Sequence, residues 1–214
     1  MTHAPNGILP EAIPFGTPKP RKEAFMVDFF QLLKRRRAVR DYEERPVPLE
    51  LVLEIIKDST LAPSSGNGQP WRFVVVNDRH WIRRLSDESK RNLVAAMDKD
   101  PDSPLRRYES VLRNEGFNVF YNAPCLVYIV GPGDVRSLQI DCALAACYLM
   151  FSAAARGLGT CWVAQGAAIA DPETLRALGI PDGYRIVAPI ILGYPKSIPG
   201  IPARSEPQIL KVLG

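Results

Sequence analysis

The chain has little histidine, and this shortage narrows its chemistry. Only two of its 214 residues are histidines, His3 and His80, and His3 lies in a proline-rich stretch at the start. A catalytic zinc site and a Ser-His-Asp triad both depend on histidine side chains. With one histidine left in the body of the chain, the sequence argues against zinc enzymes and serine hydrolases.

Cysteine is also scarce, and no two cysteines form a CxxC pair. All of them lie among apolar residues, where a thiol behaves as a small hydrophobic group. We therefore expect reduced core cysteines and not a disulfide framework. The four cysteines are Cys125, Cys142, Cys147 and Cys161.

Long hydrophobic runs are missing as well. The most apolar stretch, 142–155, is about 14 residues long, which suits a buried core helix better than a membrane span. Residues 1–20 lack the apolar core of a signal peptide. We therefore expect a cytoplasmic protein without a membrane partner.

Charge of one sign does not dominate the composition. The 27 Lys and Arg residues exceed the 23 Asp and Glu residues by only 4, which does not call for a nucleic acid partner. Hydrophobic residues make up 46% and charged residues 23%, as in soluble globular proteins. The composition excludes a disordered chain, and the length fits one domain.

Proline spacing and hydrophobic periodicity divide the chain into three parts. Residues 1–22 are proline-rich and are expected to form an extended or disordered arm. Residues 23–193 carry the helix and strand patterns of a single domain. Residues 194–214 start as proline-rich extended chain and resemble an arm that needs another surface to lie on.

Helix and strand patterns alternate irregularly within the domain. The strands are too few and too unevenly spaced for a doubly wound nucleotide fold, so an α+β fold is predicted. The predicted helices are 25–37, 48–62, 79–108 with a break near 100–104, 135–156 and 172–179, and the predicted strands are 72–76, 125–130, 160–163 and 186–192.

Three of these elements carry further expectations. The helix at 135–156 is apolar on nearly every face, which favours burial in a large core or under a partner subunit. The charged segment 79–108 has few apolar positions and is interpreted as a mobile cover. Pro189, inside the last strand, argues for an edge strand or a bulge.

Three arginines, Arg36, Arg37 and Arg40, lie at the end of the first predicted helix. In one interpretation they complement the carbonyl end of the helix dipole. In the other they form an anion site, because a guanidinium group matches phosphate with two parallel donors. Arg36 and Arg40 share a face if the helix persists, whereas a helix that ends at Arg37 lets the turn surround an anion.

The loop Pro63–Trp71 (PSSGNGQPW) is rich in hydroxyls, amides and glycines between two prolines. Such residues are common in any loop. Its glycines also allow the backbone to approach a ligand closely, and its Ser and Asn side chains can bind a polar heterocycle or a polyol. Trp71 either covers the loop or belongs to the core.

Two other features have structural explanations. Gly131–Arg136 follows a strand and precedes a helix, as a dinucleotide fingerprint does. Arg136 stands where that fingerprint needs a third glycine, and Asp134 is better explained as a helix cap. Asp141, within the apolar helix, is expected to pair with an arginine or to face an interface.

Three segments together resemble the signature blocks of the nitroreductase family of FMN enzymes. They are Arg36–Arg40 (RRAVR), Pro63–Trp71 and Gly157–Trp162 (GLGTCW), in the family's order and spacing. The resemblance extends over roughly residues 25–207. It implies an α+β fold with a central, mostly antiparallel sheet flanked by helices. It also implies an intertwined homodimer with FMN at the subunit interface.

The resemblance also implies roles for particular residues. Arg36, Arg37 and Arg40 would bind the FMN phosphate and the pyrimidine side of the ring, and Arg204 in the carboxy-terminal arm would also reach the phosphate. Pro63, Ser64, Ser65 and Asn67 would approach the flavin from the partner subunit. The stretch that directly follows the third segment would face the N5 and O4 edge of the flavin with its backbone N–H groups, and it comprises Val163, Ala164, Gln165 and Gly166.

Two positions depart from the family pattern. Ala38 stands where the family usually has serine, so one hydroxyl contact to phosphate is lost. Ala203 precedes Arg204 where many members carry a second cation. Both changes predict weaker FMN retention, and the substitution Ala38→Ser tests the first.

The function implied by the resemblance is an FMN-dependent oxidoreductase. It takes hydride from NADH or NADPH and reduces a small electron-poor acceptor, such as a nitroaromatic, a quinone or an enone, in a ping-pong cycle. FMN carries the redox chemistry, so no catalytic side chain is needed, which suits a chain with so little histidine. No metal is expected.

Other functions remain open at this point. The family also contains reductive dehalogenases and a flavin-fragmenting enzyme of cobamide-ligand synthesis. A flavin-storage protein without turnover is an alternative from another class. A basic nucleic-acid-binding module is the most remote, since the basic cluster is short and lacks interleaved aromatic residues.

Overall fold

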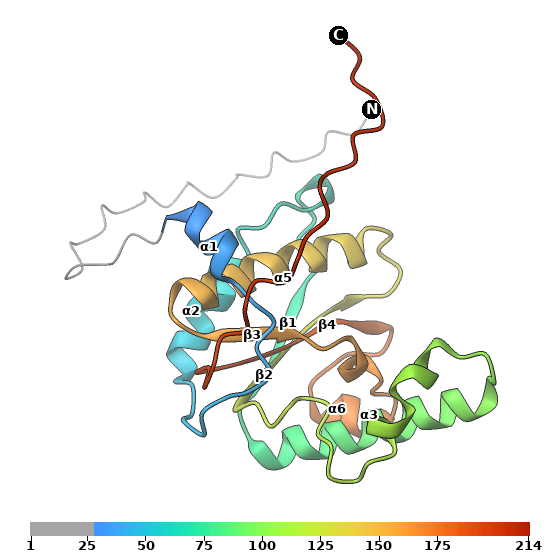
Figure 1. Ribbon diagram of the computed structural model, residues 1–214. Coiled ribbons are helices and arrows are strands. Elements are labelled where there is room, and N and C mark those ends of the chain that lie inside the picture. The colour runs from blue at the N-terminus through green and yellow to red at the C-terminus, as the bar shows by residue number, and fades with distance from the viewer. Residues whose placement is uncertain (1–27) are drawn as a thin grey trace, which may run out of the picture.

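A computed structural model describes residues 28–214 of the chain (Figure 1). Its centre is an open antiparallel sheet of four strands in the order β1-β2-β4-β3. The predicted arm 1–22 and the start of the first predicted helix lie outside the described residues. The strands are β1 (Arg72–Val76), β2 (Cys125–Pro132), β3 (Gly159–Trp162) and β4 (Tyr184–Gly193).

Helices cover both faces of this sheet (Figure 1). One face carries α1 (Phe29–Arg35), α2 (Leu49–Ser59) and α5 (Leu138–Ala155). The other face carries α3 (Arg79–Lys99), α4 (Glu109–Leu112) and α6 (Pro172–Ala177). Three 3₁₀ helices complete the structure: η1 (Ser65–Asn67), η2 (Pro104–Tyr108) and η3 (Ala164–Ala167).

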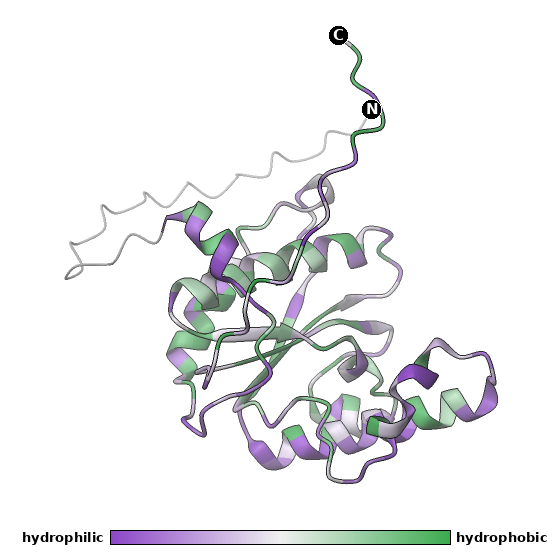
Figure 2. Ribbon diagram, viewed as in Figure 1, coloured by the Kyte–Doolittle hydropathy of each residue, from purple (hydrophilic) through white to green (hydrophobic). Residues whose placement is uncertain are grey.

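The two-sided burial explains the continuous apolar run in β2. Alternate side chains point to opposite faces of a strand. Cys125, Val127 and Ile129 therefore pack toward α2 and α5, whereas Leu126 and Tyr128 pack toward α3. In Figure 2 the apolar colouring follows these central strands and α5, while much of α3 is hydrophilic.

Pro189 lies in β4, which is an interior strand between β2 and β3, so the edge-strand interpretation is wrong. The register between β2 and β4 does shift at Ile129/Val130, but this irregularity lies at Val187, two residues before Pro189, which itself pairs regularly with Tyr128. The Pro189 carbonyl accepts the Val163 N–H at 2.9 Å, on the β3 side of the strand. Because β3 ends at Trp162, no residue of β3 lies opposite Pro189 to accept a backbone N–H, so proline at this position costs no hydrogen bond between strands.

The long apolar helix α5 starts at Leu138, three residues later than predicted, and ends before Gly157. By length and composition it could cross a membrane, and 39% of it is buried in the structure. Its inner side packs against the sheet and α2, as expected of a core helix. Its other side remains exposed and apolar, with Ile140 68% exposed.

The segment predicted as a mobile cover divides into two structures. The break near residue 100 is confirmed, because α3 ends at Lys99 and η2 begins at Pro104. Ile82 and Leu85 of α3 are buried in the core beneath the sheet, so α3 is not a cover. The low number of apolar residues predicted an exposed segment. This prediction was wrong because α3 also buries small polar side chains, Ser86 and Ser89.

The carboxy-terminal arm begins where the chain leaves β4. Tyr42 and Pro195 form an isolated bridge, and the Lys196 N–H donates to the Asp41 carbonyl at 3.1 Å. Beyond this point, residues 198–214 form no helix or strand and are exposed throughout. Figure 1 shows this segment leaving the body of the molecule.

Candidate functional site

The arginine segment leaves α1 as extended chain and lies beside β3. The helix ends at Arg35, and Arg36 already has extended backbone angles. Ala38 forms a parallel bridge with Thr160, and the Val39 N–H donates to the Thr160 carbonyl at 2.9 Å. The approach is close, because a Cβ on Gly159 would lie 2.7 Å from the Val39 Cβ. Glycine at position 159 therefore brings the arginines to the edge of the sheet.

The extended backbone divides the three arginines between two cavities. Arg36 and Arg37 line a cavity of about 280 Å³ together with Arg35, which the sequence analysis did not single out. Arg40 lines a different cavity of about 700 Å³. The interpretation in which Arg36 and Arg40 share a helical face is wrong, because the helix ends before both of them.

Thr160 lies at the smaller cavity with an unused hydroxyl group. The residue is buried, and its Oγ1 has no hydrogen-bond partner among residues 28–214. Leaving a buried hydroxyl without a partner costs free energy, and such groups often mark a site that a ligand completes. Thr160 pairs with Ala38, the position at which the resemblance implies that a hydroxyl contact to phosphate is lost.

The larger cavity joins the arginine segment to η3 and to the chain that follows α3. Val163, Ala164 and Gln165 line it beside Arg40, so these four predicted residues come together. Arg107 and apolar and aromatic residues from α3, η2, α4, the chain after α4 and β3 complete the wall. The remaining lining residues are Leu93, Leu105, Arg107, Tyr108, Val111, Phe117, Tyr121, Cys161 and Trp162.

Gly166 fixes the η3 turn behind this wall. A Cβ at this position would overlap the ring of Phe120, which is fully buried. The Tyr128 hydroxyl donates to the Gly166 carbonyl at 3.1 Å, and the Ser89 hydroxyl donates to the Gln165 carbonyl. The turn that carries the predicted backbone donors is therefore held from β2 and from α3.

The loop Pro63–Trp71 lies apart from both cavities in a single subunit. Gly66, Asn67 and Gln69 have positive φ angles of 55°, 54° and 44°, so the loop follows a left-handed path that favours glycine. Trp71 is buried in the core and does not cover the loop. Pro63, Ser64, Ser65 and Asn67 do not line the cavity of Arg40 or that of Arg36.

The Asp141 carboxylate binds the backbone of this loop. Its Oδ1 accepts the Ser65 N–H at 3.0 Å, and the residue is 2% exposed. Its Oδ2 has no hydrogen-bond partner within residues 28–214, and no arginine among these residues forms an ion pair with it. The expected arginine partner is therefore wrong, and a backbone N–H of the loop takes its place.

Arg204 does not join the other arginines in a single subunit. It lies in the exposed segment beyond residue 198 and lines neither cavity. Its assignment to the phosphate therefore stays a prediction that depends on where a partner subunit receives this segment.

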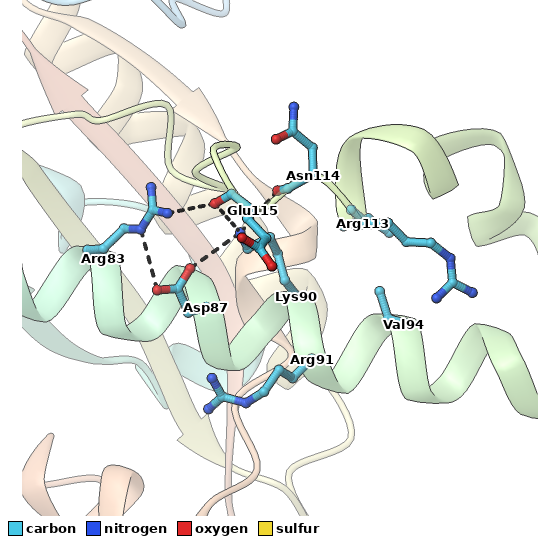
Figure 3. A pocket seen from close by; sticks show the side chains of 9 residues that line it. Arg83, Asp87, Lys90, Arg91, Val94, Arg113, Asn114 and Glu115 are labelled. Atoms are coloured by element: carbon cyan, nitrogen blue, oxygen red, sulfur yellow. Dashed lines mark hydrogen bonds and ion pairs between the residues drawn. The ribbon is translucent and has the colours of Figure 1, made fainter.

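The aromatic residues of the larger cavity were not apparent from sequence patterns, and two of them follow an anchored turn. The Lys90 ammonium group donates to the carbonyls of Asn114, Glu115 and Phe117 at 3.3, 3.2 and 2.8 Å. Arg83 donates to the Glu115 carbonyl at 2.7 Å. Figure 3 shows these cations converging on the turn, where they border a separate hollow of about 550 Å³.

This anchored turn precedes Phe117 and Tyr121, whose rings meet edge to face at 5.7 Å. Lys90 and Arg83, which border the hollow, are thus engaged in holding the cavity wall. The aromatic run Phe117–Tyr121 was the available sequence signal, but hydrophobic periodicity alone does not say which aromatic residues face a cavity.

No His, Asp or Glu lies among the described residues that line the larger cavity, whose titratable side chains are those of arginines, tyrosines and Cys161. Burial raises the pKa of the Cys161 thiol, although Arg40 and Arg36 oppose the shift. Burial also raises the pKa of Cys125 to about 12 and that of Cys142 to about 11. His80 is exposed on α3, away from the cavity. Within residues 28–214, no three His, Cys, Asp or Glu side chains are grouped to hold a metal ion.

Comparison with known proteins identifies the family. The sequence profile of the Nitroreductase family matches residues 33–194, about three quarters of the chain. The chain belongs to the nitroreductase family. This match confirms the resemblance of the three sequence segments. It also confirms that the chain is an enzyme of the oxidoreductase class.

Two relatives in this family illustrate its range. A protein of Archaeoglobus fulgidus named for NADH dehydrogenase and NAD(P)H nitroreductase activity is 29% identical over 80% of this chain and 87% of its own length. The 5,6-dimethylbenzimidazole synthase of Rhodospirillum rubrum is 31% identical over 80% of this chain and 83% of its own length.

A solved nitroreductase from Bacteroides fragilis with bound FMN confirms the predicted fold. It superimposes with a TM-score of 0.72 at 23% identity, over 86% of this chain and 97% of its own. The α+β architecture with an antiparallel sheet is therefore that of the nitroreductase fold.

Proposed function

We propose that the chain is an FMN-dependent oxidoreductase that takes hydride from NADH or NADPH and reduces a small electron-poor acceptor. One observation carries this proposal. The cavity of about 700 Å³ brings Arg40 together with Val163, Ala164 and Gln165 and contains no acid–base pair among the residues described. A site of this kind suits chemistry that a bound cofactor supplies.

The residues present fit FMN. Arg36 and Arg40 form no ion pair within residues 28–214, so their charge is available to an anion, and the buried Thr160 hydroxyl has no partner there. When bound, FMN would accept hydride from the reductant and pass electrons to the acceptor. The B. fragilis protein with the same fold holds FMN.

The division of the arginines suggests their roles. Arg36 and Arg37 would hold the phosphate at the smaller cavity, helped by the Thr160 hydroxyl in place of the one that Ala38 lacks. Arg40, facing the larger cavity, would stabilise negative charge on the reduced ring. The backbone of Val163–Gly166 would orient the ring edge.

We infer further that two subunits complete the site. The exposed apolar side of α5, the exposed Phe29 and Phe30 of α1 and the apolar carboxy-terminal arm are surfaces that a second copy would cover. In such a homodimer Pro63, Ser64, Ser65 and Asn67 would come from one subunit and the arginines from the other. Arg204 would reach the phosphate with the arm.

Three further expectations accompany this proposal. The unpaired thiols suit a cytoplasmic protein. The small net charge of +4 supports a small-molecule substrate and not a nucleic acid. In the cycle the reductant and the acceptor would use the larger cavity in turn, each leaving before the other enters.

The first test is a visible absorption spectrum of the purified protein before and after anaerobic NADH or NADPH. We expect a flavin spectrum that bleaches and recovers on addition of a quinone. A flavin that neither reductant bleaches would favour storage, and no flavin after reconstitution with FMN would overturn the proposal. A search for 5,6-dimethylbenzimidazole among the products tests flavin fragmentation, and halide release from a haloaromatic acceptor tests dehalogenation.

A further inference from the structure

The larger cavity has cationic groups but no carboxylate. Of the described residues that line it, Arg40 and Arg107 are charged, and none is Asp or Glu. Neither arginine forms an ion pair within residues 28–214. A partly enclosed site with unpaired positive charge attracts an anionic ligand. Arg40 has a role toward FMN in the function proposed above, and Arg107 has none.

The local structure turns Arg107 toward the cavity. Its neighbour Arg106 donates to the carbonyls of Pro101 and Met97 at 2.8 and 3.2 Å and pairs with Glu109. Arg106 therefore fastens the η2 turn to the end of α3. Arg107, the next residue of that turn, stays free of such bonds and lines the cavity.

An aromatic ring orients the Arg107 guanidinium group. Its Cζ lies 4.7 Å from the ring centroid of Tyr108. A guanidinium group stacked on a ring keeps its N–H donors pointing outward in the plane, where a carboxylate can accept two of them. Arg107 is therefore available to bind an anion without first breaking another ion pair.

The remaining walls suit a flat aromatic molecule. Phe117, Tyr121 and Trp162 line the cavity together with Tyr108. The Arg40 guanidinium lies 5.6 Å from the Tyr121 ring, and the Phe117 carbonyl is held by Lys90 at 2.8 Å. The aromatic wall is thus anchored from α3, and a ring placed against it would lie within reach of an arginine.

We propose that Arg107 binds an anionic substituent of the electron acceptor, so that the preferred acceptors are aromatic carboxylates that also carry the reducible group. The inference rests on the proposed function, because it assigns the acceptor class of that same site. It makes Arg107 a specificity-determining residue, and a neutral acceptor of the same shape would be reduced less efficiently.

The test compares two acceptors of nearly equal size, 4-nitrobenzoate and 4-nitrobenzamide. The wild-type holoenzyme should show a kcat/KM for the carboxylate that exceeds that for the amide by about tenfold, as expected for a charged hydrogen bond. Arg107→Gln should abolish this preference by raising KM for the carboxylate, and Arg107→Lys should retain part of it. An unchanged ratio in Arg107→Gln would overturn the proposal.

Arg84→Gln is the matched control. Arg84 also stacks on an aromatic ring, 4.8 Å from the Trp81 centroid, but it lies in α3 and does not line the cavity. Its variant should keep the wild-type preference. The ratio of the flavin reduction rates with NADPH and with NADH should be the same in wild type and Arg107→Gln. A selective loss with NADPH would assign Arg107 to the phosphate of the reductant and would also overturn the proposal.

A binding measurement separates this inference from the proposed function. Calorimetric titration of the protein with 4-nitrobenzoate should give an affinity that Arg107→Gln reduces about tenfold, whether or not the nitro group is reduced. If NADH and NADPH fail to bleach the flavin, the proposed function fails while this titration still tests Arg107. If the flavin bleaches but 4-nitrobenzoate binds wild type and Arg107→Gln with the same affinity, only the Arg107 inference fails.

Discussion

The carboxylate of Asp141 and the backbone of Ser65 are joined by a hydrogen bond of 3.0 Å across 76 residues of sequence. Asp141 lies in the first turn of α5, and Ser65 is the first residue of η1. The core helix therefore holds the loop that we expect to meet FMN in the partner subunit. The second oxygen, Oδ2, is buried without a partner among the described residues and is available to a donor from that partner.

Asp141→Leu should lower the free energy of unfolding by roughly 1–3 kcal/mol, because the Ser65 N–H loses its hydrogen bond to the buried Asp141 carboxylate. Asp141→Asn should cost less, since its amide oxygen still accepts that N–H. Urea denaturation measures both changes, and retention of FMN during gel filtration should fall in the same order. Asp134→Asn serves as control, because Asp134 is exposed and lies before α5, whose N-cap is Ser137, so the predicted cap role of Asp134 is wrong. Equal unfolding midpoints for wild type and Asp141→Leu would contradict this account.

Gly166→Ala should destabilise the protein by roughly 1–3 kcal/mol, because the added methyl group overlaps the buried Phe120 ring. The η3 turn would shift, and FMN should bind more weakly. A double-mutant cycle with Phe120→Leu checks the cause, since the smaller side chain should relieve part of the overlap. Strictly additive unfolding free energies would show that the two residues do not interact.

Asp171 should contribute stability that depends on pH. Its side chain accepts from the Thr174 hydroxyl at 2.8 Å and from the Thr174 N–H at 2.9 Å, and these bonds lower the pKa of the carboxyl below 3.8. A lowered folded-state pKa adds stability above the unfolded value, and this stability is lost as the pH falls through the folded value.

Asp171→Ala should therefore be less stable than wild type at pH 7, and the difference should shrink below about pH 4. Thermal unfolding across this pH range measures the effect. Asp102→Ala, at an exposed site outside any helix, should show no such convergence. A difference that persists unchanged at pH 2 would show that the cap does not act through the ionised carboxylate.

Ile140→Glu should shift a dimer toward monomers. Ile140 is 68% exposed on the apolar outer side of α5, and burying a charge in an apolar interface is costly. Glutamate near a helix start suits the helix dipole, so the subunit itself should remain folded. Sedimentation velocity measures the assembly, and circular dichroism checks the fold.

The neighbouring change Gln139→Glu adds the same charge at an exposed position without removing an apolar side chain. It should leave assembly unchanged. If Ile140→Glu sediments like wild type, the outer side of α5 is not the subunit interface.

Much of the fold was accessible from local sequence patterns. The strand at 72–76 has the predicted bounds, and the predicted break near residue 100 separates α3 from η2. Asp171 caps α6 and Pro172 begins it, as their spacing indicates. Such features depend on neighbours within a few residues, and periodicity, caps and prolines record them directly.

The candidate site was accessible only in part. Local patterns and family resemblance together named the arginines, the loop and the η3 segment. They did not show that Arg36 and Arg40 face different cavities, because this depends on where α1 ends. They also missed Phe117 and Tyr121, whose place in the cavity wall depends on a turn that Lys90 anchors from α3.

By itself, the sequence determined the fold class, the family and the scarcity of histidine that points to cofactor chemistry. These follow from composition, periodicity and short motifs. Only the tertiary structure decided the partner of Asp141, the interior position of Pro189 and the cavity that places Arg107 beside aromatic rings. The physical reason is that these relations join segments far apart in the chain, and packing of the two layers against the sheet, not local preference, brings them together.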